Sequence, residues 1–395
     1  MPLAELQYMT DDLRKLRAEG LHQKLMVMET EQSAICRFDG QEVINLSSNN
    51  YLGLATHPKL KQRAGEAIER YGVGTCGVRT IGGNMTLHMM LEEKIASFKS
   101  VEAAVLFQGG FTANAGTIQT ILTKDDIVIS DELNHASLID GCRLSGAKVK
   151  IFPHKDIEAC EKILKGIMNR TGRRLLITDS VFSMEGDIAP LPELVDLAER
   201  YHCIMMIDDA HALGVLGRNG RGAVDHFNLH GRVDIEVGTL SKAVAAVGGY
   251  VCSKRDVIEF LHHRARPLLF STSHPPSVAA ACLAAFEVLE DESGRIQTLW
   301  SNTNFFKEGL KSLGFDTGVS ETPITPVIVG DTPLAHEFSR QLFAAGIFAK
   351  SLGYPTVPRG RARVRTIVSA THSMGDLSRA LEIFGAVGKQ LKIIH

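Results

Sequence analysis

The stretches that decide the fold are Ile204-Met205-Met206-Ile207-Asp208-Asp209-Ala210-His211 and Thr239-Leu240-Ser241-Lys242-Ala243. The first is an apolar run that ends abruptly in two aspartates, and Lys242 follows Asp208 by 34 residues. A carboxylate at the end of a buried strand is costly unless a cation or a hydrogen-bond network compensates its charge. We therefore expect Asp208 to have a cationic partner or a hydrogen-bond network, and we expect Asp208 and Lys242 to supply one site with a carboxylate and an amine.

Short apolar runs separated mostly by helix-length segments predict an α/β fold. The runs cover residues 103–107, 127–130, 149–152, 175–178, 204–207, 235–238 and 249–252. Runs that are apolar throughout are typical of strands buried on both faces. Intervening segments such as 156–168 and 191–201 have helical length, which indicates βαβ units. We predict a mostly parallel seven-stranded sheet flanked by helices.

The pattern of helical and strand-like segments changes on both sides of this region, which predicts three parts. We expect an N-terminal helix and arm over residues 1–57, a large α/β domain over 58–285 and a smaller α+β domain over 286–395. Leu6, Met9, Leu13 and Leu16 share one face of the first helix. Such a face fits either a cover for its own domain or an arm on a partner subunit. We expect a site between two tightly packed domains.

Composition excludes several classes of function. The 43 basic and 45 acidic residues create no overall field for nucleic acid or an anionic membrane. An acidic N-terminus argues against a signal peptide, and no stretch approaches the roughly 18 apolar residues of a membrane span. Seven cysteines without a C-x-x-C pair suggest reduced thiols, and no H-E-x-x-H or cysteine-histidine set predicts a metal. We expect a cytoplasmic protein.

Two glycine-rich segments differ in their context. Gly72-Val73-Gly74-Thr75-Cys76-Gly77 matches G-x-G-x-x-G, but it follows a helical pattern over residues 58–71 rather than a strand. That context argues against a dinucleotide site. Gln108-Gly109-Gly110-Phe111 instead follows a predicted strand and precedes a helix over 112–122. Such a helix start binds phosphate, and Phe111 can cover a flat ring. An ordinary turn with a core phenylalanine is the alternative.

Polar side chains follow four predicted strands. His135 comes after the second strand, and Ser183 and Asp187 come after the fourth. Ligands bind outside the carboxyl ends of open parallel sheets, so we expect these groups to converge with those after the fifth and sixth strands. His135 is placed to stack on an aromatic cofactor or to move a proton, and a capping or structural role is its alternative.

Three arginines near the C-terminus complete the set. Arg361, Arg363 and Arg365 alternate with Ala362 and Val364, a spacing that puts all three on one face of a strand. Stacking aromatics do not accompany them, which favours a clamp for a substrate carboxylate over nucleic acid. A lysine, a carboxylate for a ring nitrogen and a phosphate turn are what a pyridoxal 5'-phosphate (PLP) enzyme needs. We therefore expect PLP as the cofactor.

In combination these segments resemble the α-oxoamine synthases, which are fold-type I PLP-dependent transferases. The similarity covers nearly the whole chain. The motifs that carry it are Ser48-Asn49-Asn50-Tyr51-Leu52-Gly53-Leu54, Asn134-His135-Ala136-Ser137, Val181-Phe182-Ser183-Met184, Asp208-Asp209-Ala210-His211, Thr239-Leu240-Ser241-Lys242-Ala243 and Arg363-Val364-Arg365.

The resemblance implies a role for each candidate residue. Lys242 would hold PLP and move the substrate Cα proton, Asp208 would pair with the ring nitrogen, and His135 would stack on the ring. Further cofactor contacts would come from Ser183 and His211 at the ring hydroxyl, Gly110, Phe111 and Thr239 at the phosphate, and Ser271 and Thr272 of a neighbouring subunit. The amino acid would contact Asn49, Arg365 and Val78. A site shared between subunits implies a homodimer.

Within the family, segments such as Arg266-Pro267-Leu268-Leu269-Phe270-Ser271 are most similar to glycine C-acetyltransferase. That similarity implies reversible condensation of glycine with acetyl-CoA to 2-amino-3-oxobutyrate, as in threonine breakdown. A bulky Val78 is expected to favour glycine over alanine. The alternative is 8-amino-7-oxononanoate synthase, which uses alanine and a pimeloyl thioester and loses carbon dioxide. An aminotransferase of the same fold and a non-catalytic protein that retains the fold are further alternatives.

Overall fold

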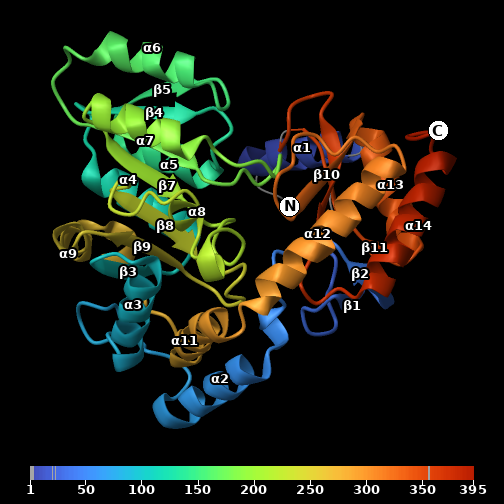
Figure 1. Ribbon diagram of the computed structural model, residues 1–395, viewed down its shortest axis with the longest axis horizontal. Helices are drawn as coiled ribbons and strands as arrows, with labels where there is room; N and C mark the ends of the chain where they lie inside the picture. The colour runs from blue at the N-terminus through green and yellow to red at the C-terminus, as the bar shows by residue number, and fades with distance from the viewer. Residues whose placement is uncertain (1–3, 20, 23, 355) are drawn as a thin grey trace.

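A seven-stranded sheet forms the centre of the computed structural model, which describes residues 4–19, 21, 22, 24–354 and 356–395 (Figure 1). Its order is β3-β9-β8-β7-β6-β4-β5. The strands are β3 (Ala103–Phe107), β4 (Ile127–Asp131), β5 (Lys148–Phe152), β6 (Arg174–Asp179), β7 (Ile204–Asp208), β8 (Ile235–Thr239) and β9 (Gly249–Ser253). β9 runs antiparallel to β3 and β8, while the other neighbours pair in parallel. The predicted α/β fold and its seven strands are confirmed.

Helices cover both faces of this sheet because alternate residues of each strand enter different apolar clusters. On β7, Met205 and Ile207 belong to one cluster and Met206 to the other. This two-sided burial explains why the strands are apolar throughout. The helices of this part are α2 (Pro58–Tyr71), α3 (Thr86–Lys99), α4 (Gly110–Ile121), α5 (Ala136–Ser145), α6 (Ile157–Ile167), α7 (Leu191–Arg200), α8 (Ala223–His226), α9 (Arg255–Arg264), α10 (Arg266–Leu269) and α11 (Pro276–Asp291).

β5 is the exception to two-sided burial. It forms an edge of the sheet, pairing with β4, and Val149 and Ile151 are exposed. The expectation that every apolar run is buried on both faces is therefore wrong for residues 149–152. An apolar edge strand follows the same sequence pattern as a central one, so the run itself gives no sign of the difference.

The C-terminal part is built on a small antiparallel sheet of β10 (Ile324–Gly330), β13 (Ala362–Ile367) and β12 (Ser351–Leu352). A second small sheet joins β1 (Ile35–Phe38) and β2 (Gln41–Asn45) to β11 (Ile347–Phe348). One apolar cluster contains Ile44, Val364 and Phe384, so part of the N-terminal region packs with the C-terminal part. The helices here are α12 (Gly294–Ser312), α13 (Thr332–Ala344) and α14 (Met374–Gln390). The domain boundaries stay a prediction.

The N-terminal helix α1 (Gln7–Ala18) keeps its apolar face open in this chain. None of its residues is buried, and Met9, Leu13 and Leu16 are exposed. The sequence left two roles open for this face, and the exposure favours an arm on a partner subunit. No helix in the described part of the chain combines the length and apolarity needed to cross a membrane.

A buried ion cluster anchors the ends of β7 and β8. Lys99, the last residue of α3, is fully buried, and its Nζ lies 2.8 Å from Asp209 and 2.9 Å from Glu236. Asp209 Oδ1 also accepts hydrogen bonds from Ser180 Oγ (2.9 Å) and from the main-chain N–H of Ala223 (3.0 Å). Asp208 is the next residue along the chain, so this cluster fixes the backbone that carries it.

Lys99→Met is expected to lower the free energy of unfolding by about 3–5 kcal/mol, because it leaves the Asp209 and Glu236 carboxylates buried without a cation. Urea unfolding followed by circular dichroism measures the loss. Lys94→Met is the control, since Lys94 pairs with Glu290 at a more exposed site on the same helix and should cost about 1 kcal/mol or less. Equal losses in both variants would contradict the anchoring role.

Candidate active site

A cavity of about 290 Å³ opens at the carboxyl ends of the parallel strands. It is lined by residues that follow β3, β4, β6, β7 and β8, as expected for an open parallel sheet. Eight of the residues predicted from the sequence line it, namely Gly110, Phe111, His135, Ser183, Asp208, His211, Thr239 and Lys242. Residues as far apart as Gly110 and Lys242 therefore meet because the sheet topology aligns the ends of their strands.

Asp208 is a buried carboxylate held by two hydrogen bonds. Its Oδ2 accepts from Asn114 Nδ2 at 2.6 Å, and its Oδ1 accepts from the main-chain N–H of Ala210 at 2.8 Å. Asn114 lies on α4 and also donates to Ser137 Oγ at 2.9 Å. The sequence analysis missed Asn114, whose signal is a buried amide in an otherwise small and apolar helix face. These bonds fix the carboxylate at the cavity wall.

Lys242 follows β8 and enters the same cavity. Burial lowers the pKa of its amine to about 8, although the carboxylates of Asp208 and Asp179 attract its charge. A lysine with a lowered pKa has more of its amine in the neutral form, which acts as a nucleophile or a base. Asp179, the last residue of β6, was not among the predicted residues, and burial followed by repulsion from Asp208 raises its pKa well above the ordinary value.

His211 is a buried histidine whose ring contacts the Tyr51 hydroxyl. Burial holds its pKa well below 6.5, and the charges of Lys242 and Arg365 add to the effect. Its Nδ1 lies 2.7 Å from the buried hydroxyl of Tyr51, whose own pKa is raised by burial. When the Tyr51 hydroxyl donates to Nδ1, the ring proton of His211 lies on Nε2. Tyr51 belongs to a quoted motif but was not expected at the site.

His135 both caps α5 and borders the cavity. Its ring Nδ1 accepts from the main-chain N–H of Ser137 at 3.2 Å, and the main-chain N–H of His135 donates to Asp179 Oδ2 at 2.7 Å. The ring meets Phe111 edge to face at 6.5 Å between centroids. Loss of solvent contact lowers the pKa of His135, against the attraction of Asp208. The capping alternative is thus correct as geometry and compatible with a place at the site.

Gly110 begins α4 beside Thr239, at the end of the cavity suited to an anion. A Cβ at Gly110 would lie 3.2 Å from Thr239 Cβ and would crowd it, so glycine keeps the backbone open there. The first N–H groups of α4 and its positive dipole end favour phosphate. A phosphate seat, a lysine amine and a fixed carboxylate in one cavity fit PLP, whose phosphate, aldehyde and ring nitrogen need these three groups.

The arginines reach the site only in part. Arg365 Nη2 lies 3.4 Å from Asn49 Oδ1, and its Nε donates to the Ser183 carbonyl at 2.6 Å, which places it beside the cavity. Arg363 is buried and paired with Glu185 at 2.9 Å. Arg361 precedes β13 and is exposed. The expectation of three arginines on one strand face is therefore wrong for Arg361, because the strand begins after it.

Three predicted residues lie away from this cavity in the single chain. Ser271 and Thr272 offer their carbonyls to Gln108 Nε2 at 3.4 and 2.9 Å. Val78 lies in a turn closed by a hydrogen bond from Gly83 N–H. Of the described residues that line the cavity, none is one of these three. The glycine segment before Val78 begins after α2 ends at Tyr71, and α3 does not begin until Thr86.

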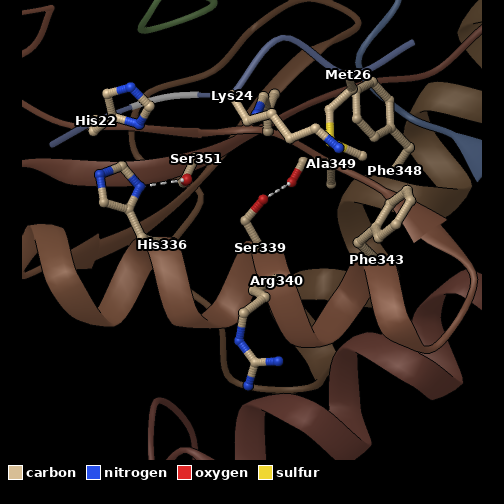
Figure 2. A pocket seen from close by; sticks show the side chains of 11 residues that line it. His22, Lys24, Met26, His336, Ser339, Arg340, Phe343, Phe348, Ala349 and Ser351 are labelled. Carbon is tan, nitrogen blue, oxygen red and sulfur yellow. Dashed lines mark hydrogen bonds between the residues drawn. The ribbon is translucent and has the colours of Figure 1, made fainter. Parts of the chain in front are cut away.

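A second cavity of about 260 Å³ lies in the C-terminal part (Figure 2). Its basic side chains include Lys24 and Arg340, which are already paired with Asp39 and Glu337. Ser339 and His336 point into it from α13 and bond to Ala349 and Ser351. Among the described residues that line it, none was predicted for the site, so the chemical groups converge on the first cavity.

Comparison with known proteins agrees with this geometry. Residues 41–384 match the family model for class I and II aminotransferases. The chain is 57% identical over 390 residues to 8-amino-7-oxononanoate synthase of Thermoanaerobacter pseudethanolicus, covering 99% of each chain. It is 56% identical to the enzyme of that name from Symbiobacterium thermophilum, covering 99% of this chain and 100% of the relative.

A serine palmitoyltransferase from S. paucimobilis, solved with bound PLP, superposes with a TM-score of 0.94 at 32% identity over 100% of both chains. The chain belongs to the α-oxoamine synthase family. Its cofactor is PLP, as expected from the lysine, the carboxylate and the phosphate seat. Membership of the α-oxoamine synthase family does not by itself fix the acyl donor or the amino acid.

Lys242→Ala is expected to abolish both covalent capture of PLP and turnover, because the amine that forms the bond is gone. In the wild-type apoprotein, capture should accelerate as pH rises through about 8, where the amine loses its proton. Intact-protein mass after borohydride reduction measures the capture. Lys254→Ala, outside the cavity, is the control. Turnover by the Lys242 variant would contradict the assignment.

Proposed function

We propose that this protein is an 8-amino-7-oxononanoate synthase, which condenses alanine with a pimeloyl thioester and releases the thiol and carbon dioxide. The observation that carries the proposal is the identity of 57% and 56% with two enzymes of that name over 99% of the chain. The glycine and acetyl-CoA reaction expected from the sequence has no such support. The comparisons favour the alternative that the sequence analysis kept open.

We assign each residue at the cavity a separate role in this reaction. We assign the amino acid carboxylate to Arg365 and Asn49, which lie side by side at the mouth of the site. Lys242 holds the cofactor and then moves the proton at the substrate Cα. Asp208, fixed by Asn114, pairs with the ring nitrogen. When bound, PLP supplies the electron sink that makes bond breaking at Cα feasible.

His135 and His211 act as neutral hydrogen-bond donors in this scheme. Their lowered pKa values keep both rings uncharged near neutral pH. The Nε2–H of His211 and the Ser183 hydroxyl suit the ring hydroxyl of the cofactor. His135 stacks on the cofactor and donates to the oxyanion that develops on the thioester carbonyl.

We also infer that two copies of the chain share their sites. Four apolar side chains are strongly exposed: Leu25 (91%), Val73 (79%), Ile81 (89%) and Phe270 (72%). Phe270 directly precedes Ser271 and Thr272, the pair expected at a neighbour's phosphate. Burial of these side chains and of the α1 face by a second copy would remove exposed apolar area and bring that pair to the partner's cavity.

Thiol release is expected to be fastest with alanine and pimeloyl thioester, with one carbon dioxide released per thiol. Glycine in place of alanine should lower kcat/KM by about 10- to 200-fold, the effect of one methyl group in a fitted pocket. The assay crosses glycine, alanine and serine with acetyl, pimeloyl and palmitoyl donors. Preference for glycine with acetyl-CoA, without carbon dioxide, would contradict the proposal and restore the acetyltransferase interpretation.

Leu13→Glu is expected to shift the protein from dimer toward monomer, because it places a charge in the apolar α1 face that the partner covers. Sedimentation velocity across a dilution series measures the shift. Gln7→Glu adds the same charge to the same helix outside that face and serves as the control. A dimer equally stable in both variants, or a monomeric wild type, would refute the inferred role of α1.

A further inference from the structure

One loop links the cavity to the C-terminal part, and every residue from Ser183 to Asp187 has a partner outside it. This 181–188 loop follows β6 and is closed by the Val181–Ile188 bridge. The carbonyl of Ser183 accepts from Arg365, and that of Met184 accepts from Arg363. The other contacts are Glu185 with Arg363, Gly186 O with Thr322 Oγ1, and Asp187 with His154 and Lys155.

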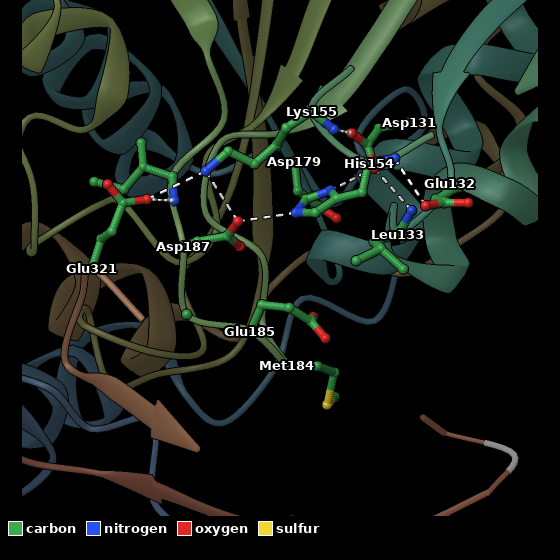
Figure 3. Close-up of polar contacts among 12 residues, drawn as sticks. Asp131, Glu132, Leu133, His154, Lys155, Asp179, Met184, Glu185, Asp187 and Glu321 are labelled. Carbon is green, nitrogen blue, oxygen red and sulfur yellow. Dashed lines mark hydrogen bonds and ion pairs between the residues drawn. The ribbon is translucent and has the colours of Figure 1, made fainter. Parts of the chain in front are cut away.

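His154 supplies the link from the 181–188 loop to the sheet (Figure 3). Its Nε2 lies 3.0 Å from Asp187 Oδ2 and its Nδ1 lies 3.0 Å from Asp131 Oδ1 at the end of β4. Ionised carboxylates accept hydrogen bonds and do not donate them, so both ring nitrogens must carry protons. The geometry therefore fits a histidine cation between two buried aspartates.

The surroundings of His154 keep it charged. Burial opposes the cation, but the hydrogen bonds and charges of Asp131 and Asp187 raise the pKa of His154 from 6.5 to about 9. The Phe182 ring meets it edge to face at 4.3 Å. The charged or titratable groups around the cluster are Asp131, Glu132, Lys155, Asp179, Asp187 and Glu321.

Arg365 depends on the 181–188 loop for its orientation. Its shortest side-chain contact is the 2.6 Å bond from Nε to the Ser183 carbonyl, whereas Nη2 lies 3.4 Å from Asn49. A Cβ at Gly186 would collide with the Ile324 carbonyl, and φ there is +74°, so the loop passes directly against the C-terminal part. Asp187 is the next residue along, and we expect its release from His154 to displace the Ser183 carbonyl that aims the guanidinium.

We propose that His154 is a positioning residue for amino acid binding, which acts as a cation through Asp187 and the 181–188 loop to orient Arg365. The inference rests on the proposed role of Arg365 as the carboxylate site. We call the contacts of His154 with Asp131 and Asp187 the latch. Loss of the latch should raise KM for the amino acid and leave capture of PLP and the chemistry after binding largely intact. A residue that only stabilises the fold would instead lower stability without this selective effect.

The test compares His154→Gln and Asp187→Asn in the PLP-loaded enzyme. We expect KM for alanine, and its affinity measured by absorbance titration, to weaken about tenfold, the effect of losing one charge-assisted hydrogen bond. We expect kcat to change less than about threefold. Arg173→Gln is the matched control, since it breaks an ion pair with buried Asp126 at the opposite ends of β4 and β6. It should lower the melting temperature and leave KM unchanged.

Measurement of KM for alanine over a range of pH, in wild type and His154→Gln, tests the role of the charge even if the variant is less stable. The His154 charge is present below pH 6.5 in any state and is lost from the folded protein as pH rises through about 9. The ratio of the two KM values should therefore fall from about ten at pH 7.5 toward one at pH 10. Ionisation of the substrate amine and of Lys242 cancels in this ratio.

The outcomes distinguish failure of the latch from failure of the proposed role of Arg365. Arg365→Lys should weaken alanine binding, and if it does not, the carboxylate assignment fails and the latch with it. If Arg365→Lys weakens binding while His154→Gln and Asp187→Asn match Arg173→Gln, the proposed function stands and the latch is refuted. A pH-independent KM ratio would also refute the role of the cation.

Discussion

The chemistry of this protein depends on one constraint, the fixed position of a buried carboxylate at the end of β7. Asp208 has two hydrogen bonds, from Asn114 and from Ala210, and both hold the oxygens toward the cavity that contains Lys242. Behind it, the Lys99 cluster neutralises Asp209, so two adjacent carboxylates coexist at one strand end. Without this anchor, the cost of burying the Asp208 carboxylate would favour its movement toward solvent.

The α/β fold and most of the site could be predicted because both depend on local patterns. Continuous apolar runs indicate central strands, and polar residues directly after them converge by topology, which accounts for His135, Ser183 and Lys242. β5 escaped this logic, since an edge strand with exposed Val149 and Ile151 has the same pattern as a buried one. The prediction failed for Arg361 because strand ends are set by pairing with a neighbouring strand and not by alternation alone.

Two of the residues that were not predicted, Asn114 and Tyr51, act through another residue rather than on a ligand. Asn114 orients Asp208 across 94 positions, and Tyr51 holds the ring of His211 across 160. No spacing rule connects such pairs, because their proximity exists only after the sheet and the C-terminal part have packed. Val78, Ser271 and Thr272 raise a different problem, since their expected place depends on a second copy of the chain. Glycine and alanine differ by one methyl group, which local motifs do not resolve.

The most direct test of the account is exchange of the alanine Cα hydrogen in D₂O, followed by NMR, for wild type and Asp208→Asn with PLP bound. We expect the variant to capture PLP on Lys242 as wild type does. We expect it to exchange the alanine Cα hydrogen at least about 100-fold more slowly, because the charge at the ring nitrogen is lost. Exchange at the wild-type rate in Asp208→Asn would contradict the claim that this fixed carboxylate drives the chemistry.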